Sequence, residues 1–218
     1  MPGFNINNFL SHINQSGVLV ANKFLVNFNA PQGLVIAETR SINSTVVNYS
    51  REMNDLITFR ADSVTAPGVT LDTANIYKLG IGPSEKKPFN ARFNDIRVSF
   101  LVDKNADLYT FFYTWINYIF NYSGSQINSV NQNTRTTGVA SYTSAYKNTY
   151  ETDIEIVMFD ESGEFPVQVF RLKKAYPVMI SDINLSWSAK STLIKLDVMF
   201  TFKDWTLDNV VSNLKQID

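Results

Sequence analysis

Paired carboxylates are the residues of this sequence whose types and spacing come closest to a catalytic site. Asp153 and Glu155 share one face of a strand pattern, and three more acids cluster within residues 160–164. Glycoside hydrolysis needs two carboxylates that face each other across a cleft, and a calcium loop needs ligands spaced around a central glycine. These neighbouring acids fit neither arrangement. We therefore predict a solvated strand face and a charged hairpin turn, with no catalytic or metal site.

Other reactive residue types are scarce. The chain of 218 residues has no cysteine and a single histidine, His12. Disulfides, thiolate zinc ligands and a cysteine nucleophile are therefore excluded, and we expect His12 to be an ordinary solvated histidine because a triad would need it in a cleft. The Gly-x-Gly-Pro segment at 80–83 lacks the helix start that follows a phosphate loop. We predict a loop over 72–90 and no cofactor.

The charge balance gives no general attraction to nucleic acid or to an anionic membrane. With 19 basic and 20 acidic residues, the net charge is −1, and basic residues are not interleaved with exposed aromatics as in single-strand binders. The N-terminus lacks the basic and apolar regions of a signal peptide. The apolar run near residues 108–122 is too short and too often interrupted to span a bilayer. We expect a soluble protein without a membrane anchor, made in a cytoplasm.

A long alternating pattern near the C-terminus, over residues 175–205, is the strongest strand signal. In its first part, Ile183, Leu185 and Trp187 share one face. Its second part places five apolar side chains on one face: Ile194, Leu196, Val198, Phe200 and Phe202. Alternation with a period of two predicts strands, and residues 189–192 would close an antiparallel hairpin between them.

Shorter alternating runs predict the remaining strands. They lie at residues 23–29, 55–64, 92–102, 150–159 and 167–172. Because helices do not separate most of these strands, antiparallel pairing is expected. The predicted fold is mainly β with one flanking α-helix, and its two antiparallel sheets form a barrel or sandwich.

The chain is divided into a central β domain and two terminal extensions. An N-terminal arm covers residues 1–21, and the β domain covers residues 22–205. Two long polar loops interrupt this domain at 37–54 and 123–149, where apolar anchors are few. A C-terminal tail with weak helical character follows at 206–218.

The predicted helix over 106–120 has more apolar surface than one domain covers. Asp103 or Asn105 can cap its N-terminus. Its polar residues follow steps of three and four and form one narrow stripe: Asp107, Thr110, Thr114, Asn117 and Asn121. The helix should therefore be sandwiched inside the fold or meet another subunit with a second face. The candidate interface residues, which include a short apolar patch in the first loop, are Tyr109, Tyr113, Phe120, Val46 and Val47.

Several stretches resemble the tail tube proteins of contractile-tailed bacteriophages, which are related to the tube protein of type VI secretion. They are the first strand at 23–28, the strand and Pro-Gly turn SVTAPGVT at 63–70, the strand FNDIRVSF at 93–100 with its F-x-D-x-x-V-x-F pattern before a helix, the strand at 150–156, and the hairpin at 176–205. The resemblance covers roughly residues 22–205 and rests on order and spacing. The two long loops depart from the simplest members.

The resemblance implies a structural virion protein without catalysis or cofactors. In such a family, hexameric rings join their sheets between subunits into an inner β-barrel, which removes free sheet edges. Stacked rings would form a tube whose lumen conducts DNA during ejection. The implied partners are further copies of the chain, sheath, baseplate and tape-measure proteins, and passing DNA that is not specifically bound. The implied location is the virion tail, after assembly in the bacterial host cytoplasm.

Three alternatives stay open on the sequence alone. The chain could form a specialised ring of the baseplate or tail terminus, or the tube of a type VI secretion system. From a different class, it could be a monomeric β module that binds glycan or nucleic acid. Rings or tubes of the purified protein would distinguish the assembly proteins from the monomeric module.

Overall fold

The computed structural model describes residues 6, 11, 19–31, 34, 54, 57–77, 80, 82–120, 122, 144–188 and 193–209. The named elements, in chain order, are β1 (Phe24–Phe28), β2 (Ala61–Val64), β3 (Val69–Ile76), β4 (Glu85–Phe93), β5 (Ile96–Leu101), α3 (Asp107–Ile119), α4 (Lys147–Tyr150), β6 (Thr152–Phe159), β7 (Pro166–Ile180), β8 (Lys195–Thr201) and β9 (Asp204–Asn209).

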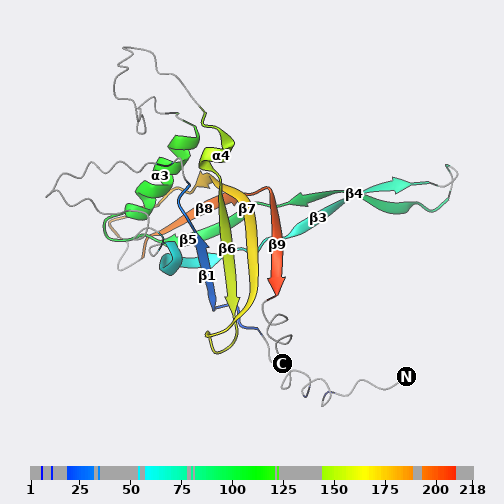
Figure 1. Ribbon diagram of the computed structural model, residues 1–218, viewed down its shortest axis with the longest axis horizontal. Helices are drawn as coiled ribbons and strands as arrows, with labels where there is room; N and C mark the ends of the chain where they lie inside the picture. Colours follow the sequence, from blue (N-terminus) through cyan, green and yellow to red (C-terminus); the bar gives the residue numbers. More distant parts are fainter. Residues whose placement is uncertain are drawn as a thin grey trace, which may run out of the picture.

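Seven of the described strands form one bent sheet, and α3 lies against it (Figure 1). The strand order is β1-β6-β7-β8-β5-β2, and β9 pairs with β7. All pairs in it are antiparallel. Strands β3 and β4 form a separate two-stranded antiparallel sheet. The predicted fold class, mainly β with antiparallel sheets and a flanking helix, is confirmed.

The large sheet bends where β7 passes from one half to the other. The first part of β7 pairs with β6 and β9, and its last residues pair with β8. At the bend, Lys174 has a left-handed φ of 57°, and its backbone N–H donates at 2.9 Å to the side-chain carboxylate of Asp153 on β6, not to a backbone carbonyl of that strand. The register with β6 shifts at this point, as in a β-bulge, which bends a strand. One strand can therefore belong to both halves.

The two ends of the strand order come near each other without closing. Strand β1 contacts β2, but no ladder joins these two strands in the described part of the chain. The sheet is therefore an open barrel or sandwich in a single copy, and among the described residues each of these two end strands has one unpaired edge.

The core lies between the bent sheet and α3. The ring centroid of Phe200 on β8 lies 5.7 Å from that of Phe28, 5.9 Å from that of Phe112 and 6.3 Å from that of Trp115. All four rings are buried. Leu196 and Val198 are also fully buried, so this part of the predicted apolar face of the last strand is confirmed. Aromatic pairs of this kind contribute about 0.5–1.5 kcal/mol beyond the area they bury.

The predicted strand through Ile183, Leu185 and Trp187 is wrong. Strand β7 ends before this run, and residues 181–188 form a connection without strand pairing. Leu185 is 77% exposed and Trp187 is fully exposed. The alternating residues have no strand to pair with, because β8 is already paired with the preceding part of β7. The predicted turn at 189–192 lies outside the described residues.

The predicted strand at 55–64 is a strand only from Ala61 onwards. Residues 57–60 are helical. Ile57 is fully buried, whereas Phe59 is 77% exposed. In a strand these two side chains would share a face, but in a helix they point in different directions. The helical turn thus separates two apolar residues that alternation had placed together.

The predicted loop over 72–90 is also wrong, because most of it forms the β3–β4 hairpin. The two strands pair from Val69–Phe93 at the base to Ile76–Glu85 near the tip. The connection includes Gly80 with φ 74°, a backbone conformation that glycine adopts readily. A register shift in the hairpin disrupts the alternation of β4, which hides the strand in the sequence.

The predicted extensions are described only in part. The sheet includes residues 206–209, which lie in the predicted C-terminal tail, because β9 pairs with β7. Helix α4 lies at the end of the predicted loop 123–149. Most of the N-terminal arm, including His12, and most of the loop 37–54 lie outside the described residues.

Helix α3 begins at a carboxylate cap. The Asp103 carboxylate accepts hydrogen bonds from the backbone N–H groups of Asn105, Asp107 and Leu108 at 3.0, 3.1 and 3.1 Å, which confirms Asp103 as the predicted cap. Burial acts to raise the pKa of Asp103, but these backbone donors outweigh it, so the pKa lies below its ordinary value.

Replacing the cap by alanine, Asp103→Ala, should lower the free energy of unfolding by about 1 kcal/mol at pH 7. Because the folded-state pKa is lowered, the charged carboxylate stabilises the fold above its unfolded pKa of about 3.9. This stabilisation is lost as the pH falls through the folded pKa. Urea unfolding of the parent chain and the variant at several pH values should therefore show a difference in unfolding free energy that becomes smaller in acid. A difference in unfolding free energy that stays constant with pH would contradict this role of the charge. Asp103→Asn is the control, because asparagine keeps a hydrogen-bond acceptor without the charge.

Candidate assembly surfaces

The acidic pair that comes closest to a catalytic site is used in structural contacts. Glu155 and Asp208 both lie beside Arg171, with Oε1–Nε and Oδ2–Nε distances of 3.2 and 3.3 Å. Asp153 accepts the backbone hydrogen bond at the bend of β7. These pairs link β6, β7 and β9, so the carboxylates stabilise the sheet surface.

The acidic cluster at 160–164 is a turn between β6 and β7. Asp160 accepts hydrogen bonds from the Ser162 hydroxyl at 2.6 Å and from the backbone N–H of Gly163 at 2.9 Å. The hydrogen bond from Ser162, followed by those from the backbone, lowers the pKa of Asp160 although desolvation acts to raise it. Its oxygens are thus occupied by the turn itself, as predicted for a charged hairpin turn.

Among the described residues, no three His, Cys, Asp or Glu side chains are placed to hold a metal ion. Within the same residues, no helix is both long and apolar enough to cross a membrane.

The exposed side of α3 differs from the predicted polar stripe. Thr114 and Asn117 are buried, and the Thr114 hydroxyl donates to the carbonyl of Thr110 at 2.8 Å. Satisfying a hydroxyl inside the helix lets this polar residue face the interior. Tyr109, in contrast, is 39% exposed. The side of α3 that faces outward is therefore partly aromatic.

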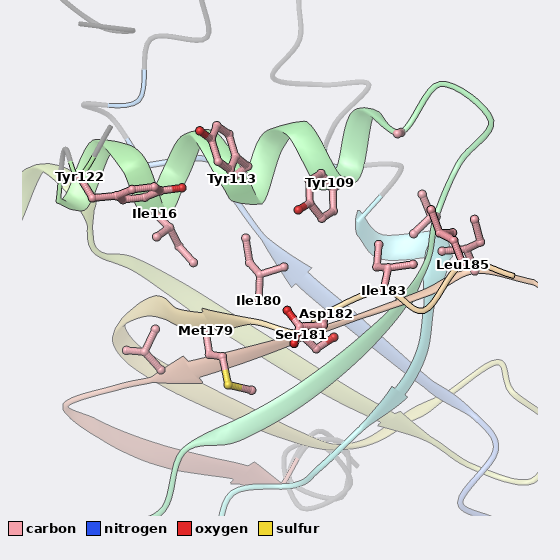
Figure 2. Close-up of a pocket in the computed structure, with 14 residues that line it drawn as sticks. Tyr109, Tyr113, Ile116, Tyr122, Met179, Ile180, Ser181, Asp182, Ile183 and Leu185 are labelled. Carbon is pink, nitrogen blue, oxygen red and sulfur yellow. The ribbon is translucent and has the colours of Figure 1, made fainter. Parts of the chain in front are cut away.

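An apolar groove runs between α3 and the end of β7 (Figure 2). It has a volume of about 860 Å³. Tyr109, Tyr113 and Ile116 line it from the helix, and Met179 and Ile180 line it from the strand (Figure 2). The connection after β7 also lines the groove, with Ser181, Asp182, Ile183 and Leu185. Here the mispredicted alternating run lies along the groove instead of in the sheet.

Tyrosines give one end of this groove a polar component. The rings of Tyr113 and Tyr122 meet edge to face, with centroids 6.3 Å apart. Burial raises the pKa of Tyr122 to about 12, with further contributions from its side-chain hydrogen bond to Tyr113 and from the nearby Tyr113 and Tyr109. The hydroxyl therefore stays neutral at ordinary pH, and the groove offers aromatic surface with uncharged hydrogen-bonding groups.

The structure brings together two of the five predicted interface residues. Tyr109 and Tyr113 both line the groove. Phe120 is 48% exposed, and it forms a β-bridge with Ser144 at the end of α3, where it does not line the groove. Val46 and Val47 lie outside the described residues. The assignment of these side chains to a subunit interface stays a prediction.

The β3–β4 hairpin is a second apolar surface, which was not predicted from the sequence. Val69 pairs with Phe93 and Leu71 pairs with Ala91, so these four side chains lie on one face of the hairpin. Val69, Leu71 and Phe93 are 53%, 59% and 38% exposed. The signal in the sequence that could have predicted this hairpin was alternation of apolar and polar residues on both sides of the Gly-x-Gly segment at 80–82.

The opposite face of the hairpin is polar. Arg92 Nη2 lies 2.6 Å from Asp72 Oδ1, and the Asn90 amide donates to the same carboxylate at 3.2 Å. The hairpin projects away from the large sheet (Figure 1), and near its base Phe93 meets Phe202 with ring centroids 6.1 Å apart. An isolated two-stranded hairpin is only marginally stable in water. An amphipathic hairpin of this kind is expected to be stabilised by another protein surface that packs on its apolar face.

Solved structures share this fold at low sequence identity. One is a chain of an extracellular contractile injection system, the PVC sheath-tube complex in its extended state. It has a TM-score of 0.54 and 14% identity, and the match covers 92% of this chain and 97% of that chain. A chain of the six-fold symmetrised anti-feeding prophage baseplate has a TM-score of 0.54 and 12% identity, with coverage of 88% and 97%. A chain of the anti-feeding prophage cap, described as the tube terminating cap, has a TM-score of 0.54 and 14% identity, with coverage of 88% and 92%.

Sequence comparison gives the family. No curated protein matches the sequence significantly. The family model described as phage tail tube protein, however, matches residues 19–208, which is most of the chain. Members of this family are structural tube proteins and not enzymes, in agreement with the structural use of the acidic residues. The chain therefore belongs to the phage tail tube protein family.

Proposed function

We propose that this tube subunit forms the tail tube of a contractile phage, as stacked hexameric rings whose lumen conducts DNA. The observation that carries the proposal is the apolar face of the β3–β4 hairpin, which a single copy leaves exposed. Further copies of the chain would cover it. The edges of β1 and β2 that have no partner strand among the described residues support the same conclusion, since pairing between subunits removes free edges. The six-fold symmetry of a baseplate that contains this fold supports a hexamer.

The proposed partners follow from the surroundings of such a tube. A contractile sheath would enclose the rings, a baseplate would bind one end, and a tape-measure protein would occupy the lumen before DNA passes. A sheath-tube complex and a baseplate are the assemblies in which similar chains were solved. The net charge of −1 supports passage of DNA without specific binding. The protein would be assembled in the bacterial host cytoplasm and end in the virion tail.

Electron microscopy of the purified chain tests the proposal. We expect rings with six subunits, and tubes of stacked rings at higher concentration. Light scattering after size-exclusion chromatography gives the subunit number independently. A protein that stays strictly monomeric at high concentration would contradict the proposal and favour the monomeric binding module.

A second candidate is the tube of a contractile injection system that carries no phage genome. The similarity in fold to the extracellular injection system favours it. Both candidates predict rings, so the test must examine the whole particle. Nuclease-protected genomic DNA and a capsid on purified particles would indicate a phage tail, whereas sheathed particles without either would indicate an injection system. Counting copies per particle separates a main tube, with many rings, from one specialised ring.

Charge placed on the predicted interface residues should block ring formation. Tyr113→Asp and Phe120→Asp each put a carboxylate on a part-exposed aromatic position of α3 or its end, where desolvating the charge opposes association. We expect both variants to elute as folded monomers in size-exclusion chromatography with light scattering.

Thr110→Asp is the matched control for these two variants. Thr110 is exposed on the same helix, and it does not line the groove. This variant should assemble like the parent chain. If Tyr113→Asp or Phe120→Asp also forms rings of parent size, that residue does not belong to a subunit interface.

A further inference from the structure

The groove beside α3 is apolar surface that a single copy leaves without cover. Around it, Val178 is 44% exposed, Leu185 is 77% exposed and Ile194 is 43% exposed. All three line the groove together with Tyr109 and Tyr113. Apolar surface gathered in one concave place is typical of a protein-binding site.

The β3–β4 hairpin carries exposed apolar side chains that could fill a groove. Asp72 pairs with Asn90 while Thr73 pairs with Pro88, so Phe89 is an extra residue at a bulge. The Phe89 side chain is 71% exposed. An exposed aromatic side chain on a protruding element is a typical anchor for a pocket in the partner. Tyrosine, methionine and isoleucine side chains line the groove that would receive it.

Charges at the two surfaces are complementary. Lys86 and Lys87 lie in β4 near the tip of the hairpin, and neither forms a salt bridge with a described residue. Asp182 lines the groove and is likewise without a salt bridge in the described part of the chain. Opposite charges that meet across an interface align the partners and exclude other registers.

The two surfaces lie on opposite sides of the molecule. In Figure 1, α3 lies at the left, whereas the hairpin projects to the far right. The hairpin therefore does not reach the groove of its own chain. A contact between different surfaces of two copies is heterologous, and repeated contacts of this kind close into a ring or continue as a filament.

We infer that the groove between α3 and β7 receives the β3–β4 hairpin of a second copy of this chain. Phe89 enters the groove beside Tyr109 and Tyr113, and Lys86 or Lys87 faces Asp182. The inference rests on the proposed function in so far as it names the contact by which tube subunits bind each other. It adds which surface of the chain is the donor and which is the receptor.

Cross-linking between two variants tests this contact directly. Because the chain has no cysteine, Ala91→Cys on the apolar face of the hairpin and Val178→Cys in the groove each introduce a single thiol. Chains with tags of different size are mixed, assembled and treated with a short bis-maleimide. We expect a band with the mass of the mixed dimer, and mass spectrometry should find residue 91 joined to residue 178.

Thr70→Cys is the matched control on the hairpin. Thr70 pairs with Arg92 on the polar face, so with Val178→Cys it should give several-fold less mixed dimer. A second test exchanges charges: Asp182→Lys should weaken assembly, and Lys86→Asp with Lys87→Asp in the same chain should restore it. Restoration requires that the two surfaces meet, and it does not depend on the cross-linker.

The outcomes separate this inference from the proposed function. Rings without the 91–178 product, or equal yields from both hairpin positions, overturn the inference and leave the tube function standing. Residue 178 joined instead to another segment of the chain, or a groove that binds a different protein in the particle, also overturns it. A chain that forms neither rings nor the cross-linked dimer contradicts both.

Discussion

Leu71→Asp is expected to abolish assembly while the chain stays folded. Leu71 is 59% exposed on the apolar face of the β3–β4 hairpin, so the substitution removes nothing from the core of the single copy. In an assembled ring the same position would be covered, and an uncompensated buried charge costs roughly 3–5 kcal/mol. This cost corresponds to a contact weaker by roughly a hundred-fold to several thousand-fold. Size-exclusion chromatography with light scattering should give a monomer over the whole accessible concentration range.

Thr70→Asp is the control for this substitution. Thr70 is the neighbouring residue of the same strand, and its side chain lies on the polar face opposite Arg92. The added carboxylate should leave ring formation unchanged, and circular dichroism should be the same for both variants. If Leu71→Asp forms rings as readily as Thr70→Asp, the apolar face of the hairpin is not an interface.

Trp115→Ala is expected to have the largest effect on the stability of the single copy. The Trp115 ring is fully buried and stacks on Phe112 with an interplanar angle of 11°. Its Nε1–H donates to the carbonyl of Tyr150 at 2.9 Å, which connects α3 to α4. Removing a buried tryptophan side chain leaves a cavity and costs roughly 3–5 kcal/mol. Urea unfolding measures the change, best in the Leu71→Asp background because assembly would make the midpoint depend on concentration.

Trp115→Phe separates the packing from the hydrogen bond. Phenylalanine keeps an aromatic ring in the core but leaves the Tyr150 carbonyl without this donor, which costs about 1–3 kcal/mol if the carbonyl stays buried. We expect its unfolding midpoint to lie between those of the parent and the alanine variant. A Trp115→Ala variant as stable as the parent chain would mean that α3 is not packed on the sheet as described.

The two expected effects concern different parts of the molecule for a physical reason. Trp115 is buried within one copy, so its loss lowers folding stability. Leu71 is exposed in one copy, so a charge there affects only association. The hairpin and the α3 groove are thus surfaces whose contribution to stability appears only in the assembled state.

Local sequence patterns were sufficient to predict the central elements. The helix and its Asp103 cap, the buried face of β8 and the strand at Ile96–Leu101 were all predicted correctly. In each case a strong local pattern and burial in the core act together. Alternation with a period of two is satisfied by pairing on both sides in β5 and β8, and a carboxylate just before a helix is stabilised by the free N–H groups of the first turn.

Two predictions failed because alternation does not identify a partner strand. The run through Leu185 and Trp187 alternates as well as β8 does, but β8 already pairs with the preceding part of β7. The hairpin over 72–90 was missed because a register shift and Pro88 disrupt the pattern of β4. Strand pairing depends on residues far apart in the chain. A local pattern carries no information about which of two candidate strands will pair with a given partner.

The sequence by itself determined the class of fold, the helix and the resemblance to tube proteins. These depend on composition and on short-range periodicity, which the chain shows directly. Only the tertiary structure decided which apolar residues are left over once the core is built. Val69, Leu71 and Phe89 look no different in the sequence from buried residues, and only the paired hairpin, away from the sheet, leaves them exposed. Burial is a property of the whole fold, and so is the surface that remains for a second copy.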